Sequence, residues 1–219
     1  MRDVLYPYRT DPPRDKDDPQ AWADHYDKIP IEHRVLNDAN LPGTVLRLPA
    51  VYGPNDGQHR LFPTLKRIDD KRPFMLLEET CAKWRFCRGY VENVAAGIVL
   101  ALTNPVAANK IYNISETYTH TTAEWDQKIA DATQWSGQIK VLPQSQMPKH
   151  LVDDDANWTQ NLNTDSTRIR QELGYQEIVP LDEALLRTIA WERENSPKQI
   201  DEAQFDYAAE DQAFQQYEN

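Results

Sequence analysis

Few residues of this chain have the type and the position to do chemistry. Arg47 lies near the carboxyl end of a short, otherwise apolar segment, Thr44 to Leu48, whose pattern predicts a buried parallel strand. Open α/β sheets bind ligands at that end of their strands, so Arg47 is a candidate ligand contact, with a structural ion pair as an equal alternative. His59 could act as an acid or a base, although a lone loop histidine is more often exposed to solvent.

Metal and redox chemistry find little support in the sequence. Asp153, Asp154 and Asp155 are consecutive, so their carboxylates do not easily converge on one ion, and the spacing of a calcium loop is missing. We expect a solvated acidic turn there. Cys81 and Cys87 are the only cysteines, and their spacing fits neither a C-x-x-C redox pair nor half of a zinc site. Two free thiols in a reducing cytosol are therefore expected.

The net charge of -11 is concentrated at one end of the chain. Residues 1–72 carry twelve basic and twelve acidic side chains, 73–150 carry seven of each, and 151–219 carry five basic against sixteen acidic. Such an end repels phosphate backbones, so nucleic-acid binding is not expected. The longest uncharged apolar run, Val94 to Leu102, is far shorter than the ~20 residues that span a bilayer. With no secretory signal at the start, we expect a cytoplasmic protein without a membrane partner.

The elements that position these residues follow a mixed α/β order. An irregular, proline-rich loop is expected over residues 6–20. Helices are expected over about 22–38, 61–70, 88–102, 121–135, 164–173 and 181–194. Strands are expected over 44–48, 110–114 and 138–142, with two short extended segments within 72–86. The composition of residues 198–219 predicts an acidic tail, with a docking helix as the alternative.

One of these helices has the clearest period in the chain. Its apolar residues recur at i, i+3, i+4, i+7, i+8 and i+11, namely Val91, Val94, Ala95, Ile98, Val99 and Leu102. We expect this face to be core. In the next helix, Thr121 and Glu124 have the spacing of a capping box.

Five stretches of the chain, in order and spacing, resemble the extended short-chain dehydrogenase/reductase family, in particular its NAD-dependent epimerase/dehydratase branch. They are Arg-Leu-Pro-Ala-Val-Tyr-Gly-Pro at 47–54, Arg-Leu-Phe-Pro at 60–63, Arg-Gly-Tyr-Val-Glu-Asn-Val-Ala at 88–95, Ile-Tyr-Asn-Ile at 111–114 and Arg-Gln-Glu-Leu-Gly-Tyr at 170–175. The resemblance covers about residues 5–195. It implies an incomplete Rossmann-like parallel sheet with a carboxyl-terminal α/β substrate-binding lobe, divided as 1–115, 116–196 and an acidic tail at 197–219.

The glycines of a dinucleotide site are missing from the sequence. No G-x-G-x-x-G or G-x-x-G-x-x-G turn occurs, and the first glycine is Gly43. Glycines are needed where backbone approaches the pyrophosphate. By resemblance, about the first hundred residues of the usual fold are absent, the catalytic Ser/Thr among them. NAD or NADP is the implied cofactor of the complete enzyme; whether this chain binds either is left open, and the chain alone is expected to be inactive.

The resemblance also points to a catalytic helix that departs from the family pattern. Members carry Tyr-x-x-x-Lys on one helical face, so that the ammonium stabilises the tyrosinate and holds the cofactor ribose. Here the residue four after Tyr26 is Pro30. In one register Tyr26 stands at the family's tyrosine position and the lysine is lost. In the preferred register Lys28 and Glu32, four residues apart, match the lysine and the later glutamate of the family pattern, and Asp24 stands at the tyrosine position. Tyr26 then needs a distorted turn to reach the substrate, because Tyr26 and Lys28 lie about 200° apart on an ideal helix.

Further contacts are implied by the same resemblance. Tyr26 and Lys28 are the implied catalytic residues, and Lys28 would also bind the cofactor ribose. The remaining candidates are contacts of the cofactor or of the substrate. Pro49 and Val51 are expected to line the cofactor site; the alternative is that they only turn the chain out of the sheet. Arg88 is expected to hold the diphosphate of a nucleotide-linked sugar, with a structural ion pair equally open. Arg60 and Tyr52 are additional substrate candidates.

The function expected of the complete enzyme is that of an NAD(P)-dependent epimerase/dehydratase-type oxidoreductase or isomerase. Its substrate would be a nucleotide sugar or a related small molecule. The alternatives are a catalytically inactive binding or scaffold remnant and a non-functional truncated product. A parallel sheet that is cut between strands exposes an apolar edge, so we expect self-association, with a homo-dimer left open.

Overall fold

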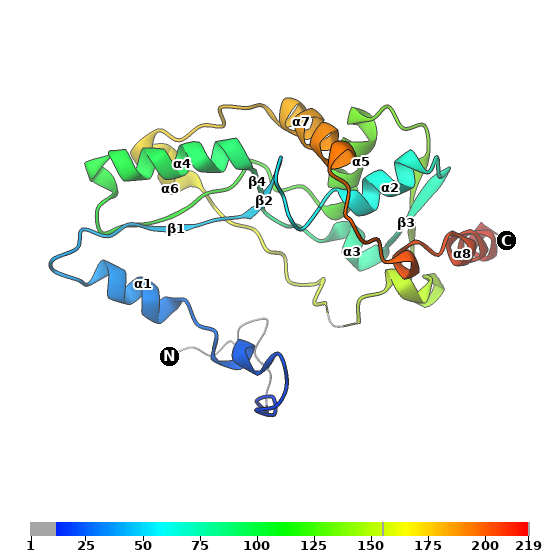
Figure 1. The fold of residues 1–219 in the computed structure, drawn as a ribbon, viewed down its shortest axis with the longest axis horizontal. Helices are drawn as coiled ribbons and strands as arrows, with labels where there is room; N and C mark the ends of the chain where they lie inside the picture. Colours follow the sequence, from blue (N-terminus) through cyan, green and yellow to red (C-terminus); the bar gives the residue numbers. More distant parts are fainter. Residues whose placement is uncertain (1–11, 155, 219) are drawn as a thin grey trace.

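The computed structural model describes residues 12–154 and 156–218, and Figure 1 shows the arrangement of its elements. The strands form three parallel two-stranded pairs. They are β1 (Val45–Arg47) with β5 (Ile111–Asn113), β2 (Ala50–Tyr52) with β4 (Arg88–Tyr90), and β3 (Phe74–Glu78) with β6 (Gln138–Leu142). Parallel pairs whose strands are separated by helices confirm the predicted α/β class.

The helices lie between and after these strands. They are η1 (Ala21–His25), α1 (Ile29–Leu36), α2 (Phe62–Asp69), α3 (Glu79–Lys83), α4 (Val91–Thr103), η2 (Pro105–Ala107), α5 (Thr122–Ala132), η3 (Gln144–Gln146), η4 (Lys149–Leu151), α6 (Thr167–Leu173), α7 (Leu181–Glu194), η5 (Glu202–Phe205) and α8 (Tyr207–Glu218). Within the described part of the chain, none of them is both long and apolar enough to cross a membrane.

The β1–β5 pair lies between helices on its two faces. Leu46 packs on one side into a core with Val94 and Ala101 of α4 and with Ile169 of α6. On the other side α1 packs against β1, and Arg47 reaches across to it. Figure 1 shows α4 and α6 above β1 and α1 below it. This three-layer arrangement positions the carboxyl end of β1.

A second core holds the carboxyl-terminal lobe together. Tyr52 at the end of β2 and Tyr90 at the end of β4 pack with Leu65, Trp125 and Leu185, which come from α2, α5 and α7. All five side chains are buried. Large aromatic rings at the ends of the β2–β4 pair therefore join it to the three helices that follow.

Two local signals read from the sequence are present as predicted. The Thr121 hydroxyl accepts a hydrogen bond from the Glu124 amide, and the Glu124 carboxylate accepts one from the Thr121 amide. These two hydrogen bonds form the capping box of α5. Gly174 ends α6 with φ 76°, a left-handed conformation that glycine adopts without a Cβ clash.

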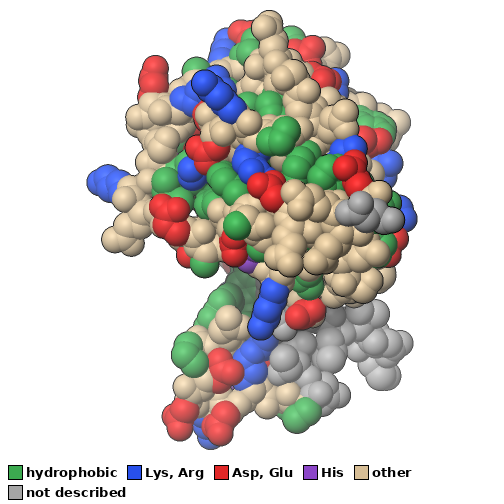
Figure 2. All heavy atoms as spheres, turned by 90° about the vertical axis from the view of Figure 1, so that its right-hand side faces the viewer, with side chains coloured by type: hydrophobic (Ala, Val, Ile, Leu, Met, Phe, Trp, Pro, Cys, Tyr) green, Lys and Arg blue, Asp and Glu red, His purple; other side chains and the backbone are tan. Residues whose placement is uncertain are grey.

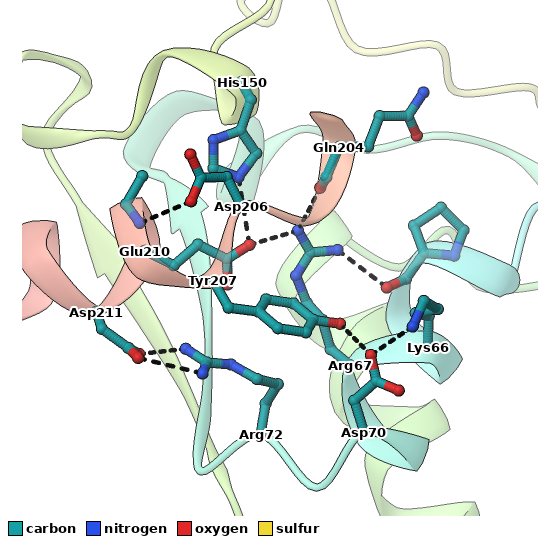
Figure 3. A network of polar contacts seen from close by, with 12 residues as sticks. Lys66, Arg67, Asp70, Arg72, His150, Gln204, Asp206, Tyr207, Glu210 and Asp211 are labelled. Carbon is teal, nitrogen blue, oxygen red and sulfur yellow. Dashed lines mark hydrogen bonds and ion pairs between the residues drawn. The ribbon is translucent and has the colours of Figure 1, made fainter. Parts of the chain in front are cut away.

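The docking helix that was the alternative to an acidic tail is present as α8, which η5 precedes. Figure 3 shows α8 and η5 held against α2 and η4 by side-chain contacts. Arg67 donates to the fully buried Glu210 at 2.7 Å, and His150 lies 3.3 Å from the same carboxylate. Arg72 pairs with Asp211 at the edge of this network. Acidic residues of the tail thus meet basic residues of the body, which composition alone did not reveal.

Three predicted elements differ in the structure. The helix expected over 22–38 is divided into η1 and α1, because Pro30 starts a new helix rather than continuing the old one. The helix expected over 88–102 begins only at Val91, since Arg88–Tyr90 pair with β2. Within 72–86 one strand is followed by α3, whose first amides are capped by the Glu78 carboxylate.

The prediction of the core face of α4 was wrong for most of its residues. Val94 is buried, but the rest of the predicted stripe beyond Val91 is exposed: Ala95, Ile98, Val99 and Leu102. The helix instead buries Gly97 and Ala101 beside Val94. A Cβ at Gly97 would lie 2.9 Å from Ile114 and 3.2 Å from Tyr175, so the small side of the helix is the one that approaches the sheet.

Candidate functional site

Tyr26 and Lys28 meet at the break between η1 and α1. Tyr26 has an extended backbone, φ −72° and ψ 107°, so the chain turns before α1 begins. The Lys28 Nζ lies 5.4 Å from the centroid of the Tyr26 ring. A hydrogen bond that the Lys28 ammonium donates to the Tyr26 side chain raises the pKa of Lys28. The distorted turn that this pair needs is therefore present, while its catalytic role stays a prediction.

The groove beside this pair is apolar with a charged centre. It has a volume of about 760 Å³ and is lined by Lys28, Ile29, Ile31, Glu32, Val35, Val45, Leu46, Arg47 and Leu48. The Arg47 guanidinium forms a fork on Glu32, with Nε to Oε1 at 2.8 Å and Nη2 to Oε2 at 2.6 Å. Of the two interpretations of Arg47, the structure supports the ion pair, because both ends of the fork are engaged.

The described glycines do not fit the pyrophosphate of a dinucleotide. Such a group needs a glycine turn between a strand and a helix, where backbone amides face the ligand. At Gly43, Gly89, Gly97 and Gly137 an added Cβ would come within 3 Å of a neighbour that belongs to the protein itself. These four glycines serve packing within the chain. No step of cofactor chemistry can therefore be assigned to a glycine turn of the described residues.

Pro49 and Val51, which were predicted to line the cofactor site, lie in a segment held by packing and by hydrogen bonds. Pro49 packs over Gly89, whose added Cβ would lie 2.8 Å from the proline ring. Val51 packs against the core under α4, and its carbonyl accepts a 2.9 Å hydrogen bond from Arg60. Arg60 also pairs with Asp56. Arg60 thus holds the loop in place, and its predicted substrate contact, like the cofactor contacts of Pro49 and Val51, stays a prediction.

Arg88 is a half-buried cation packed between aromatic rings. Its guanidinium lies 4.5 Å from the Trp125 ring and 5.6 Å from the Phe86 ring, and Nη1 donates to the Phe86 carbonyl at 3.0 Å. Burial lowers the pKa of Arg88, although an arginine keeps its charge. Among the residues that the structure describes, no carboxylate forms an ion pair with it. The ion-pair alternative is not what the structure shows, although Asp126 and Glu116 act on the charge of Arg88 from a greater distance.

Two carboxyl groups near Arg88 were missed from the sequence. Glu116 accepts a 2.8 Å hydrogen bond from Tyr52, and burial raises the pKa of both side chains. Asp126 accepts a 2.9 Å hydrogen bond from Thr64, and burial raises the pKa of its carboxyl to about 6. Glu116 follows the strand expected over 110–114 at its carboxyl end, which is a signal that could have found it. Tyr52 itself is buried, so its contact with a substrate stays a prediction.

His120 lies near this cluster, with its ring centroid 6.2 Å from that of Trp125. Burial lowers the pKa of His120, and nearby Lys128, Arg88 and Arg85 lower it further against the opposing effect of Glu124. His120 lines an open groove of about 480 Å³ along α5. The groove is lined by the acidic Glu124 and Asp131 as well as by Lys128.

The two parts of the predicted site are separated in space. Figure 1 shows α1, and the blue segment before it that includes η1, lying apart from β2 and β4. Figure 2 shows a narrow waist between the larger part of the molecule and the smaller part below it, where η1 and α1 lie. The structure brings Tyr26 to Lys28, and Arg88 to Glu116 and Asp126, but it does not bring these groups together.

The other candidates have structural partners. His59, expected as an exposed loop residue, lies 2.8 Å from the buried Glu192 carboxylate and stacks on Trp191. That expectation was wrong because α7 reaches the loop. Asp154 accepts a hydrogen bond from Gln144, and Asp155 lies outside the described residues. Over residues 12–154 and 156–218 there is no cluster of three or more acidic, histidine or cysteine side chains that could hold a metal ion.

Comparisons with known proteins point to one family. Residues 13–115 match the model of the NAD dependent epimerase/dehydratase family. No match was found among curated proteins. The fold is similar to that of several solved enzymes of which this chain spans about half the length.

Three of these structures illustrate the similarity. The dTDP-glucose 4,6-dehydratase of Streptomyces venezuelae, with NAD bound, is 22% identical with a TM-score of 0.58, over 81% of this chain and 51% of that one. The UDP-glucuronic acid 4-epimerase of Bacillus cereus, in complex with UDP-glucuronic acid and NAD, is 15% identical with a TM-score of 0.56, over 81% and 53%. The Bordetella bronchiseptica enzyme WbmF, in complex with NAD+ and UDP, is 20% identical with a TM-score of 0.57, over 94% and 57%. At these identities the likeness shows the fold, a partial Rossmann-like α/β structure.

Proposed function

Since residues 13–115 of this chain belong to the NAD dependent epimerase/dehydratase family, we propose that the chain supplies the substrate-binding part of an NAD(P)-dependent epimerase or dehydratase that acts on a nucleotide sugar. One observation carries the proposal. Arg88 lies half-buried against an aromatic ring without an ion-pair partner among the described residues. A guanidinium in that setting is well placed to bind a diphosphate through paired hydrogen bonds.

The residues around Arg88 would fix how the substrate lies. Trp125 restricts the guanidinium to one face, which leaves its free N–H groups in a defined direction. Glu116 and Asp126 keep a raised pKa and so can stay protonated near neutral pH more readily than surface acids.

Tyr26 and Lys28 would serve the proton chemistry. NAD or NADP, when bound, exchanges a hydride with the substrate, and the glycines of this chain do not fit its diphosphate. What these residues themselves offer is a tyrosine hydroxyl whose proton is held beside an ammonium. In this proposal Lys28 orients the cofactor ribose, and Tyr26 or a water exchanges the proton with the substrate.

Nucleotide binding tests the proposal without need of the cofactor. Isothermal titration of the chain with UDP and with dTDP should give saturable binding that is weaker for uridine, because the diphosphate is the group that Arg88 holds. Arg88→Ala should weaken UDP binding by about 10- to 150-fold, the equivalent of a charge-assisted hydrogen bond of about 1.5–3 kcal/mol. The matched control is Arg85→Ala, since Arg85 already pairs with Glu124. Equal affinities for the wild type and Arg88→Ala would sink the proposal.

A second function, an inactive binding protein of the same family, is favoured by one observation. In Figure 1 the segment that leads into α1 lies apart from β4, so proton chemistry and substrate contact are not joined. The two functions separate in a turnover assay with NAD and UDP-sugars on a full-length protein that supplies the cofactor-binding half. Binding of UDP with no turnover, and with no change on Tyr26→Phe, would support the binding protein. Turnover that is lost in Tyr26→Phe would support the enzyme.

A further inference from the structure

Three half-buried aromatic side chains lie together beside Arg88, and we call them the aromatic cluster. The Trp84 and Phe86 rings are stacked, with centroids 4.9 Å apart and an angle of 24° between their planes. The Trp158 ring meets Trp84 edge-on, with centroids 5.0 Å apart and an angle of 74°. Aromatic side chains contribute most to cores and to binding interfaces, and the hydrophobic cores of the described residues do not include these three.

The cluster is continuous with the Arg88 cation. Trp84, Phe86 and Arg88 occupy alternate positions of an extended segment, and alternate side chains of such a segment share a face. The Arg88 guanidinium accordingly lies over the Phe86 ring, 5.6 Å from its centroid. A positive charge and a row of aromatic faces are therefore presented side by side.

Backbone hydrogen bonds hold the segment of the cluster from two sides. The Leu162 amide donates to the Arg85 carbonyl at 2.9 Å, and the Thr122 amide donates to the Trp84 carbonyl at 2.9 Å. The Trp84 indole itself donates to the Gln160 carbonyl at 2.8 Å. Because these contacts orient the rings before a ligand arrives, little side-chain entropy would be lost on binding.

We propose that the aromatic cluster binds the base of the nucleotide whose diphosphate Arg88 holds, by stacking on the face of the base. The inference rests on the proposed function. A nucleotide joins a planar ring to an anion, and the cluster offers aromatic faces next to a cation. Stacking on aromatic side chains tolerates every base, because each base has a π-face. Purines have the larger face, so recognition of this kind favours an adenine nucleotide over a uracil nucleotide.

A second aromatic pair near Arg88 has a different geometry. The Tyr118 and His120 rings meet edge-on at 81°, with centroids 4.7 Å apart. Tyr118 is 53% exposed, and its hydroxyl donates to the Glu124 carboxylate at 3.2 Å. This pair lacks the stacked faces of the cluster, so Tyr118 supplies an aromatic control outside it.

Ligands with and without a base separate the cluster from Arg88. Isothermal titration of the chain with ADP, UDP and pyrophosphate should show tighter binding of ADP than of UDP. Trp158→Leu should weaken ADP binding by about 5- to 150-fold, the range that base stacking contributes, and leave pyrophosphate binding unchanged. Arg88→Ala should weaken the binding of all three ligands, whereas Tyr118→Leu should change none of them.

Two substitutions at Trp84 test the aromatic face itself. Trp84→Phe and Trp84→Leu both lose the indole hydrogen bond to Gln160, but only the first keeps a ring. ADP affinity should therefore be largely retained in Trp84→Phe and lost in Trp84→Leu. The wild type gives an independent measurement, because a base stacked on tryptophan should quench the protein fluorescence, and pyrophosphate should not.

The outcomes distinguish this inference from the proposed function. ADP binding that Arg88→Ala weakens, but that Trp158→Leu and Trp84→Leu leave unchanged, would overturn the stacking and keep the proposed function. ADP binding without quenching of the wild-type fluorescence would do the same. Affinity for ADP that is equal to or below that for UDP would contradict recognition through the face of the base. Binding that Arg88→Ala does not weaken would overturn both proposals.

Discussion

Two regions of the molecule are stabilised in different ways. The carboxyl-terminal lobe, with α2, α5, α7 and α8 around the β3–β6 pair, has a continuous core and buried ion pairs at its margin. The amino-terminal region, with η1, α1 and β1, contacts the rest through the three-residue pairing of β1 with β5 and the packing of Leu46, while the ion pair between Arg47 and Glu32 joins α1 to β1 within the region. The part of the molecule that holds Arg88 therefore has a hydrophobic core of its own, whereas the part that holds Lys28 is attached through a smaller contact.

The largest expected effect comes from breaking the network that holds α8. Glu210→Ala leaves Arg67 buried without its carboxylate, and loss of one partner of a buried pair costs about 3–5 kcal/mol. Urea unfolding followed by tryptophan fluorescence measures the change. The exposed pair of Arg193 and Asp69 supplies the control, because Arg193→Met should cost about 1 kcal/mol or less.

A double variant sharpens this test. Arg67→Met combined with Glu210→Leu removes both charges and keeps apolar volume, so most of the loss in Glu210→Ala should be recovered. If the double variant is as unstable as Glu210→Ala, the cost arises from packing rather than from an unpaired charge.

The next effect concerns how stability varies with pH in the same lobe. Burial raises the pKa of Asp126 to about 6 from its ordinary value of 3.8, so the folded protein binds a proton more tightly than the unfolded chain. The free energy of unfolding should therefore fall as pH rises from about 4 to about 6, by at most about 3 kcal/mol from this group. Asp126→Asn should remove that part of the slope in thermal melts across this range. Asp131→Asn, an exposed acid on the same helix, should leave the slope intact; an unchanged slope in Asp126→Asn would count against the enclosed carboxyl.

The smallest effect on global stability is expected in the amino-terminal region. Arg47→Met leaves Glu32 without its fork, yet α1 has few other contacts, so the global unfolding midpoint should move little. Hydrogen exchange of α1 should instead rise by about tenfold or more, since local opening loses a charge-assisted contact of about 1.5–3 kcal/mol. Exchange in α5 serves as the internal control. Equal acceleration in both helices would show that the two regions unfold together.

Local rules accounted for many elements but not for their surroundings. The Thr121 and Glu124 cap and the stop at Gly174 follow from short-range geometry, and both are present. The position of Pro30 was also visible in the sequence, although its consequence, a break that joins Tyr26 to Lys28, needed the actual path of the chain. Asp126 lies on a correctly predicted helix, but its neighbours along the chain did not indicate that its carboxyl would be shielded from solvent.

The sequence by itself determined the α/β order, the family resemblance, the helix ends and the absence of a glycine turn, because each depends on residues close together in the chain. Only the tertiary structure decided which side of α4 is buried and which basic residues pair with the acidic residues of α8. It also decided that Arg47 has an ion pair while Arg88 has none with any described residue. Those outcomes depend on segments far apart in sequence, and helical periodicity shows which residues share a face without showing which face meets the core.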